Sequence, residues 1–449
     1  MLQLPSIKTP SIKLPSVGFG LPRRRSASDL VGLDIQPGLV AAVKVRVNGS
    51  IRAERAAAQP LDADTVREGE VVDPEALTEA LRELFSAGTL GKRVRVGIAN
   101  QRTVMRTLEL PPVTDRKELA AAVRFQAQDQ VPMPLSNAVL DFHPLGIFDS
   151  PAGPRQRVVL VAAQRDMVER LLAAVRAAGL TPQGVDLSAF ALIRSLYDRN
   201  DGEDARVLYV NVDGLTNLAI AEGTTCRFTR VVGGGVEAMA AELAVRRSVA
   251  LSTARALLTS VDLSAPLAPE AAAVLAPVEQ SAAQPLGESI AEQAHGEQTP
   301  EGASEPGFER AAAEPTLSRE EYEAREASMG YSETIEAAHP APEPEPEPSA
   351  PAADADVREV LENGVREIAG EIRNSLDFHR TQDQGGEVAH VALSGAALDL
   401  PGFAAALQAT LGMEVRSDAV GLVDAELEGK VSTHRLSVAA GLATTEAPQ

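Results

Sequence analysis

Apolar residues along this chain recur with the period of a strand in some stretches and with that of a helix in others. Residues 40–47 form an apolar run in which valine alternates with other residues, which is typical of a half-buried strand. Asn48-Gly49 follows and supplies a favoured two-residue turn, and residues 50–56 return. The folded part of the chain is therefore predicted to open with a β-hairpin.

Strands and helices then alternate along the sequence. Asp73 followed by Pro74 predicts a helix start, because an aspartate side chain can cap free N–H groups and proline fits the first turn. A second hairpin is predicted across Glu222-Gly223. The other predicted strands are residues 93–99, 139–144, 157–163, 207–212 and 390–393, and the other predicted helices are residues 118–128, 167–178, 236–249, 357–381 and 402–411. This alternation predicts an α/β fold.

Three short turns that contain glycine and other small residues each follow directly on an apolar run. They lie within residues 30–56, 208–223 and 388–407. Such a turn lets backbone N–H groups face a phosphate, and the absence of a bulky Cβ permits close approach. A single turn of this kind carries little information. Three in this order predict an actin-like, two-lobed nucleotide-binding fold.

Composition indicates aliphatic cores in a chain that stays inside the cell. With 449 residues the chain is long enough for two or three domains, and it has no tryptophan and only 3% aromatic residues. Cys226, its single cysteine, excludes an intrachain disulfide, fits a reducing compartment and is predicted to be inert core. The six histidines show no ligand spacing, so we predict no zinc site. There is no apolar run of about 20 residues and no secretory signal, so we expect a cytoplasmic protein.

The formal net charge of −21 is concentrated in one segment. Residues 265–356 contain 20 Asp and Glu against three Arg, a net −17, which leaves −4 for the rest of the chain. This segment is rich in Pro, Ala and Glu and lacks periodicity, so we predict a long disordered acidic insertion within a domain. Residues 1–29 are predicted to be a disordered basic arm, with contact to anionic lipid or an acidic partner as the alternative.

Residues 109–146 carry a specific sequence block. Within it, Val131-Pro132-Met133-Pro134-Leu135 is followed by Val139-Leu140-Asp141-Phe142. A strand, an acidic helix, a Pro-x-Pro-Leu turn and a Val-Leu-Asp-aromatic strand occur in this order in the type IV pilus assembly protein PilM family. The chain resembles that family over about residues 30–260 and 357–425.

The resemblance implies an FtsA-related, actin-like (RNase H-like) fold. It divides the chain into a first lobe of residues 30–103 and 184–205, an inserted α/β subdomain of residues 104–183, and a second lobe of residues 206–264 and 357–445. Members of the family lie in the cytoplasm under the inner membrane and bind the cytoplasmic N-terminal segment of the membrane protein PilN in a groove beside the inserted subdomain. Capture of a short segment in a groove is physically reasonable for such a lobe.

The partners that the resemblance implies are therefore a PilN-like membrane protein and other pilus assembly proteins. Membrane contact would be indirect or through the basic arm, self-association is left open, and no nucleic-acid partner is expected. The family's role is to join the membrane complex to the assembly motor.

The resemblance also implies where ATP and Mg²⁺ would bind. The matching positions are Asp34, Gly38, Gly214, Thr216, Gly233, Gly234, Gly235, Ser394 and Gly395. Asp34 would position Mg²⁺ through water, and the alternative for Asp34 is a strand-end residue that caps a turn. No residue is assigned a catalytic role.

Several of the family's positions are altered in the first turn. Gln36 replaces a glycine, Pro37 and Gly38 occupy hydroxyl positions, and Ala41 stands where a lysine is expected. Pro37 also removes one backbone donor from a loop whose chemistry depends on donors.

The second and third turns depart as well. The usual aspartate of the second turn is Asn211, and the usual glycine is Asp213, whose carboxylate would repel phosphate unless Mg²⁺ lay between them. In the adenosine loop Ala396 and Ala397 stand in place of further glycines.

These departures favour a binding scaffold with a degenerate nucleotide site over an enzyme. The alternatives are an active ATPase whose turnover moves the lobes, an FtsA-like cell-division protein, and a secretion-system relative. Residues 440–449 lack the amphipathic basic helix of an FtsA-type membrane anchor, and no paired carboxylates point to a sugar kinase.

Overall fold

Two β-sheets with the same strand order form the framework of the protein. A computed structural model describes residues 29–202, 204–265, 350–382, 386–423 and 432–444. The predicted basic arm, apart from residue 29, and most of the predicted acidic insertion lie outside the described residues. All statements below concern the described part.

The first sheet has six strands in the order β10-β6-β1-β2-β3-β16. They are β1 (Leu30–Gln36), β2 (Leu39–Val47), β3 (Ile51–Pro60), β6 (Arg93–Ile98), β10 (Thr181–Leu187) and β16 (Gly421–Leu422). The first three form an antiparallel meander, and β6 and β10 continue parallel to β1. A two-stranded ribbon of β4 (Val66–Arg67) and β5 (Glu70–Val71) lies beside them in the sequence.

The second sheet repeats this topology in the order β13-β12-β11-β14-β15. Its strands are β11 (Arg206–Val212), β12 (Thr216–Glu222), β13 (Thr225–Val232), β14 (His390–Ser394) and β15 (Val415–Ser417). Again three strands form an antiparallel meander, and two more continue parallel to its first strand. Parallel neighbours place the ends of β11 and β14 at the same edge of the sheet.

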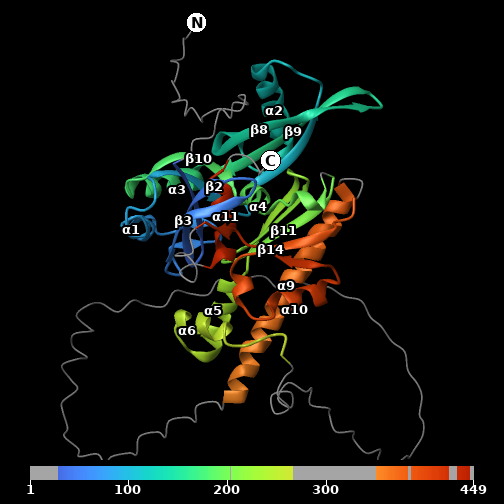
Figure 1. Cartoon of the computed structure of the whole chain (residues 1–449). Helices are drawn as coiled ribbons and strands as arrows, with labels where there is room; N and C mark the ends of the chain where they lie inside the picture. Colours follow the sequence, from blue (N-terminus) through green and yellow to red (C-terminus); the bar gives the residue numbers. More distant parts are fainter. Residues whose placement is uncertain (1–28, 203, 266–349, 383–385, 424–431, 445–449) are drawn as a thin grey trace, which may run out of the picture. The chain divides into compact units, whose positions relative to one another are not determined.

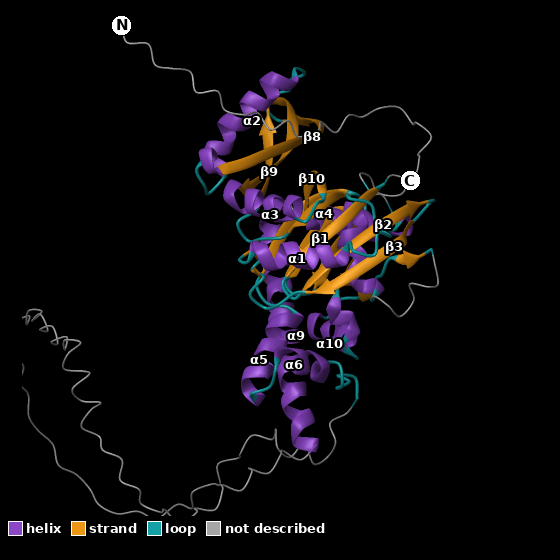
Figure 2. Cartoon of the chain, turned by 90° about the vertical axis from the view of Figure 1, so that its left-hand side faces the viewer, coloured by secondary structure: helices purple, strands orange, loops and turns teal. Residues whose placement is uncertain are grey.

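Helices cover both sheets. α1 (Pro74–Leu84) and α3 (Arg165–Ala177) pack on one face of the first sheet, as Figure 2 shows for α1. The outer face of the second sheet packs against α5 (Val236–Arg247), α6 (Leu251–Leu258), α9 (Ala350–Gln382) and α10 (Phe403–Leu411). α9 and α10 lie side by side (Figure 1). Phe403 is fully buried there, and burial of such a side chain stabilises the fold by about 2–3 kcal/mol.

Two short helices contact both sheets. α4 (Ser188–Leu196) and α11 (Ser437–Leu442) pack on each other, on β11 and β12, and, through α11, on β1 and β2. The packing is close enough to need glycine. A Cβ added to Gly32 would lie 1.8 Å from the carbonyl oxygen of Ala439, and one on Gly441 would lie 1.8 Å from that of Ala191.

The inserted segment forms a third sheet in the order β7-β9-β8. It comprises β7 (Val104–Leu110), β8 (Ala138–Ser150) and β9 (Gly153–Gln164), all antiparallel, with α2 (Arg116–Gln130) packed on it. Short 3₁₀ turns at Leu135–Asn137, Arg199–Asp201, Ala396–Asp399 and Thr433–Leu436 join other elements.

Most predicted elements are present. The hairpin turns at Asn48-Gly49 and after Glu222 are confirmed, and Asp73 Oδ1 accepts from the N–H groups of Glu75 and Ala76, both at 3.0 Å, at the start of α1. Several predicted bounds differ from the structure, and two of them differ most. α9 begins at Ala350, before the predicted residue 357, and β8 extends to Ser150, beyond the predicted residue 144.

The reasons for these errors are physical. The start of α9 contains Pro351, and proline is tolerated in the first turn of a helix, so the Pro-rich composition of the segment did not prevent helix formation. β8 continues because its pairing with β9 shifts register between Pro144 and Gly146, which breaks the alternating pattern that a regular strand would show.

Candidate functional site

The three glycine-containing turns meet at one place. The first turn joins β1 to β2, the second joins β11 to β12, and the third follows β14. The contacts between them come from Pro37 in the first turn, Asp213 and Gly214 in the second, and Ala396 in the third. The three turns that stand out in the sequence are thus linked by contacts in the structure.

The first and second turns touch each other directly. A Cβ added to Gly214 would lie 2.2 Å from the carbonyl oxygen of Pro37, and one on Gly38 would lie 2.5 Å from the carboxylate carbon of Glu237. Gly38 also has a φ of 79°, a conformation that favours glycine. Glu237 is in turn paired with Arg255 at 2.6 Å. Gly38 and Gly214 therefore allow segments of the protein to approach each other closely.

Asp213 lies at the centre of the contacts between the second and third turns. One carboxylate oxygen, Oδ1, accepts from the N–H of Ala396 at 3.0 Å and from Nε of Arg435 at 2.9 Å. The other, Oδ2, accepts from Nδ2 of Asn211 at 3.2 Å. The side chain of Asp213 is only 3% exposed. Both oxygens of this buried carboxylate are therefore hydrogen-bonded within the chain.

Asp34 lies nearby at the end of β1. It is 4% exposed, and its Oδ2 accepts from Nε2 of Gln36 at 2.6 Å. Burial raises the pKa of Asp34 to about 7, with the amide of Gln36 and the charge of Arg435 opposing the rise and the charge of Asp213 adding to it. Burial also raises the pKa of Asp213, against the opposing charge of Arg435.

The remaining predicted residues are engaged in local contacts. Thr216 Oγ1 donates to the carbonyl oxygen of Gly234 at 3.0 Å, and a Cβ on Gly235 would lie 2.3 Å from the carbonyl oxygen of Asp213. A Cβ on Gly233 would have only Nε2 of Gln101 within 4 Å, at 3.4 Å, so Gly233 and Gly234 have the most space.

The third turn is tied to the segment that precedes α11. Ser394 Oγ is hydrogen-bonded to the carbonyl oxygen of His434 at 2.8 Å and to Ser437 Oγ at 2.7 Å, and the N–H of Gly395 donates to the same carbonyl at 3.1 Å. Gly395 has a φ of 96°, and a Cβ there would lie 2.5 Å from the carbonyl oxygen of Val212.

Sequence reasoning missed two charged residues of this site. Arg435 lies 222 positions along the chain from its partner Asp213, and the carboxylate of Glu237 packs against Gly38 of the first turn. A lone arginine near the end of an irregular segment carries no signal in the sequence. Glu237 follows the Gly233-Gly234-Gly235 run by two positions, which is the only sequence signal that could have pointed to it.

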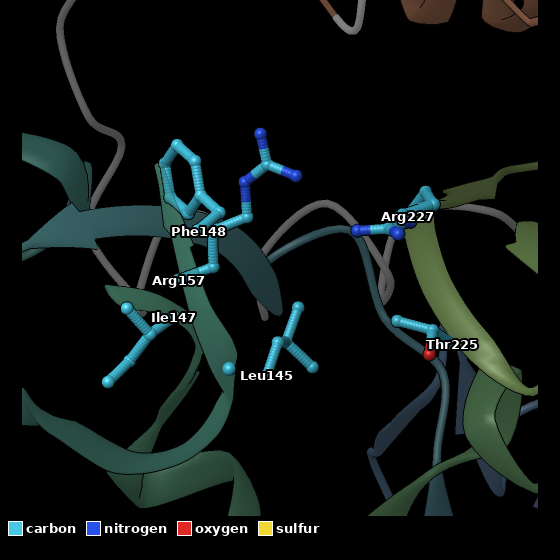
Figure 3. A pocket seen from close by; sticks show the side chains of 7 residues that line it. Leu145, Ile147, Phe148, Arg157, Thr225 and Arg227 are labelled. Carbon is cyan, nitrogen blue, oxygen red and sulfur yellow. The ribbon is translucent and has the colours of Figure 1, made fainter. Parts of the chain in front are cut away.

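A separate cavity of about 160 Å³ lies beside the inserted subdomain, and we call it the β8–β9 groove. It is lined by Leu145, Gly146, Ile147, Phe148, Arg157, Thr225 and Arg227. Figure 3 shows the side chains from β8 and β9 on one side and those of Thr225 and Arg227, from β13, on the other. Ile147 is 62% exposed, and the guanidinium of Arg157 stacks 4.2 Å from the ring centre of Phe148.

Comparison with known proteins identifies the family. The model of a family described as type IV pilus assembly protein PilM matches residues 32–291, more than half of the chain. The chain belongs to the PilM family. The predicted family is thereby confirmed.

The first of three similar solved structures confirms the predicted fold. A chain of a PilM-PilN type IV pilus biogenesis complex is similar with a TM-score of 0.63 at 21% identity, covering 93% of this chain and 98% of the other. EutJ, an ethanolamine utilization protein from Carboxydothermus hydrogenoformans, gives 0.44 at 13% identity and covers 92% and 88%. MreB5 of Spiroplasma citri bound to ADP gives 0.43 at 11% identity and covers 92% and 94%. This PilM-family chain has the actin-like fold.

Several groups at the three turns that could face a nucleotide are bonded within this PilM-family chain. The first two turns touch, since a Cβ on Gly214 would lie 2.2 Å from the carbonyl oxygen of Pro37. Of the groups that could face an anion, the Ala396 N–H and the Nε of Arg435 are already bonded to Asp213. Asp34, the predicted Mg²⁺ position, is hydrogen-bonded to Gln36, and the charge of Asp213 acts on its carboxyl group. Among the described residues no group of three or more His, Cys, Asp or Glu is placed to hold a metal ion.

Two further observations concern Cys226 and the membrane. Cys226 is buried, its Sγ donates to the carbonyl oxygen of Phe228 at 3.3 Å, and burial raises the pKa of its thiol to about 12. This agrees with the predicted inert core role. Within the described ranges, none of the helices combines the length and the apolar character needed to cross a bilayer.

Proposed function

We propose that this PilM-family chain is an actin-like scaffold of the type IV pilus assembly machine. It binds the cytoplasmic N-terminal segment of a PilN-like inner-membrane protein and links that protein to the assembly motor on the cytoplasmic face of the membrane. The support is membership of the family and similarity, over almost all of both chains, to a protein solved in a complex with PilN. Membership of the PilM family favours a role in pilus assembly over the alternative of an FtsA-like cell-division protein.

The observation that carries the scaffold role is the packing of the three turns. Pro37 touches Gly214, and the Asp213 carboxylate takes up the N–H of Ala396 and the guanidinium of Arg435. Rapid turnover of ATP needs donors that are free to meet the transferred phosphate and a metal that bridges its oxygens. A chain whose donors are bonded internally is suited to binding a partner without turnover.

The β8–β9 groove is the place that we propose for the partner segment. Leu145 and Ile147 offer apolar contact, and Arg157 and Arg227, each already ion-paired with a glutamate, present guanidinium groups at its sides. A short extended segment with an apolar side chain and a nearby carboxylate would complement both features. The groove lies beside the inserted subdomain, where the family resemblance predicts partner binding.

Calorimetric titration of the full chain with the cytoplasmic N-terminal peptide of its PilN-like partner tests this proposal. We expect binding without nucleotide and no heat from Mg-ATP. The variant Ile147→Asp should weaken peptide binding at least about tenfold, because it places a charge in an apolar contact. The matched control is Val245→Asp, since Val245 is 80% exposed on α5 and does not line the groove.

Three outcomes would count against the proposal. If the peptide does not bind, the proposed partner is wrong. If both variants bind the peptide equally, the β8–β9 groove is not its binding site. A nucleotide switch is the second candidate function, favoured by the meeting of all three turns at one place. Tight ATP binding that changes the affinity for the peptide would support that switch and refute nucleotide-independent binding.

A further inference from the structure

We propose that the carboxylate of Asp213 is an internal anion that stands where a nucleotide phosphate would bind and keeps the site closed to ATP. This inference rests on the proposed function and gives a physical reason for partner binding without nucleotide. The inference rests on the contacts of one side chain and on the way its backbone is held.

The donors around Asp213 are those that an anion site provides. A backbone N–H, a guanidinium and a side-chain amide converge on the two oxygens, from Ala396, Arg435 and Asn211, at 3.0, 2.9 and 3.2 Å. Donors of this kind bind phosphate oxygens in proteins generally. Here they come from the end of β11, the third turn and the segment before α11, so one carboxylate joins three parts of the chain.

Charge complementarity supports the same assignment. The Asp213 side chain is 3% exposed and that of Arg435 is 23% exposed, so the pair is largely shielded from water. A buried carboxylate is costly unless it is paired and hydrogen-bonded, and Arg435 supplies the pairing. A phosphate beside this carboxylate would bring two like charges into contact.

The backbone of Asp213 is held by two hydrogen bonds and by a close contact with Gly235. Its carbonyl oxygen accepts from the N–H of Val236 at 2.8 Å, and its N–H donates to the carbonyl oxygen of Leu215 at 3.0 Å. Gly235 packs against the same carbonyl so closely that a Cβ would lie 2.3 Å from it. With its backbone held in this way and its two oxygens bonded to Ala396, Arg435 and Asn211, the carboxylate is anchored at the site.

Removal of the carboxylate should expose its donors to an external anion. In Asp213→Gly, the guanidinium of Arg435 and the N–H of Ala396 lose their acceptor, and the full-length variant should melt at a lower temperature than the wild type. Inorganic phosphate should then raise the melting temperature of the variant by more than chloride at equal ionic strength does. The wild type keeps the carboxylate of Asp213, so its melting temperature should respond equally to phosphate and chloride. The control Asp377→Asn should behave in the same way, because Asp377 is 73% exposed on α9.

Titration with Mg-ATP provides the second readout. Asp213→Gly should bind at least about tenfold more tightly than the wild type, since a fixed negative charge has been removed from the phosphate position. If this variant fails to fold, Asp213→Ser takes its place with the same expectation, because serine removes the negative charge and is shorter than aspartate.

The inference is overturned if the folded variant shows no response specific to phosphate, or if the wild type binds Mg-ATP as tightly as the variant. Peptide titrations separate this result from the proposed function. A wild-type chain that fails to bind the PilN-like peptide would refute the scaffold and leave the Asp213 result unchanged.

Discussion

The carboxyl of Asp34 should make the stability of this protein depend on pH. Its pKa is 3.8 in an ordinary environment and about 7 in the folded chain, chiefly because burial disfavours the charged form. Between these two values the folded chain holds a proton that the unfolded chain releases. The folded state is therefore favoured at low pH and loses stability as the pH rises through this window.

The size of the loss follows from the two values. One pKa unit corresponds to 1.36 kcal/mol, so ionisation of Asp34 costs the folded chain about 4 kcal/mol once the pH exceeds 7. The substitution Asp34→Asn removes the charge and keeps an oxygen that can accept from Nε2 of Gln36. For a folded part of roughly 320 residues, 4 kcal/mol corresponds to about 6 °C in melting temperature.

The assay is thermal unfolding of wild type and Asp34→Asn, followed by circular dichroism from pH 4 to pH 8. The variant should match the wild type near pH 4 and melt about 6 °C higher near pH 8, with the difference opening across the window. Asp213 and Arg435 are the charged groups that contribute to the shift, and both proteins retain them. A difference that stays constant from pH 4 to pH 8 would refute the reasoning, as would a variant that melts lower at pH 8.

Two further predictions concern packing and helix capping. Gly32→Ala should destabilise the protein by about 3 kcal/mol in urea unfolding, because its Cβ would lie 1.8 Å from a backbone oxygen, whereas the control Gly184→Ala, with no atom within 4 Å, should change little. Equal urea midpoints for the two would contradict the close packing. Asp73→Ala should cost about 1 kcal/mol, because two N–H groups of α1 lose their acceptor, and an unchanged urea midpoint would show that the cap contributes nothing.

Local features of the fold could be predicted because their causes are local. Asn48-Gly49 makes its turn with its own neighbours, and Asp73 caps the helix that follows it directly. The block in residues 109–146 is specific to the PilM family, and the fold was predicted from the resemblance to that family.

The chemistry of the site could be predicted only in part. The sequence marked Asp213 as an unusual residue at a glycine position, and the repulsion of phosphate followed from its charge. That Arg435 and the N–H of Ala396 would neutralise it depends on contacts across 222 and 183 positions, which no pattern in one sequence reveals. The direct contact of Pro37 with Gly214 has the same origin.

The packing of α11 on β1 also has a consequence for the order in which the protein folds during synthesis. β1 leaves the ribosome early, yet the helix that covers one face of its sheet is made some 400 residues later, and β16 pairs with β3 across a similar distance. Until then the apolar face formed by Ala41, Val43 and Val45 has no cover. The nascent first sheet is therefore a segment for which a chaperone has time to act, and closure of that core is a late event in biogenesis.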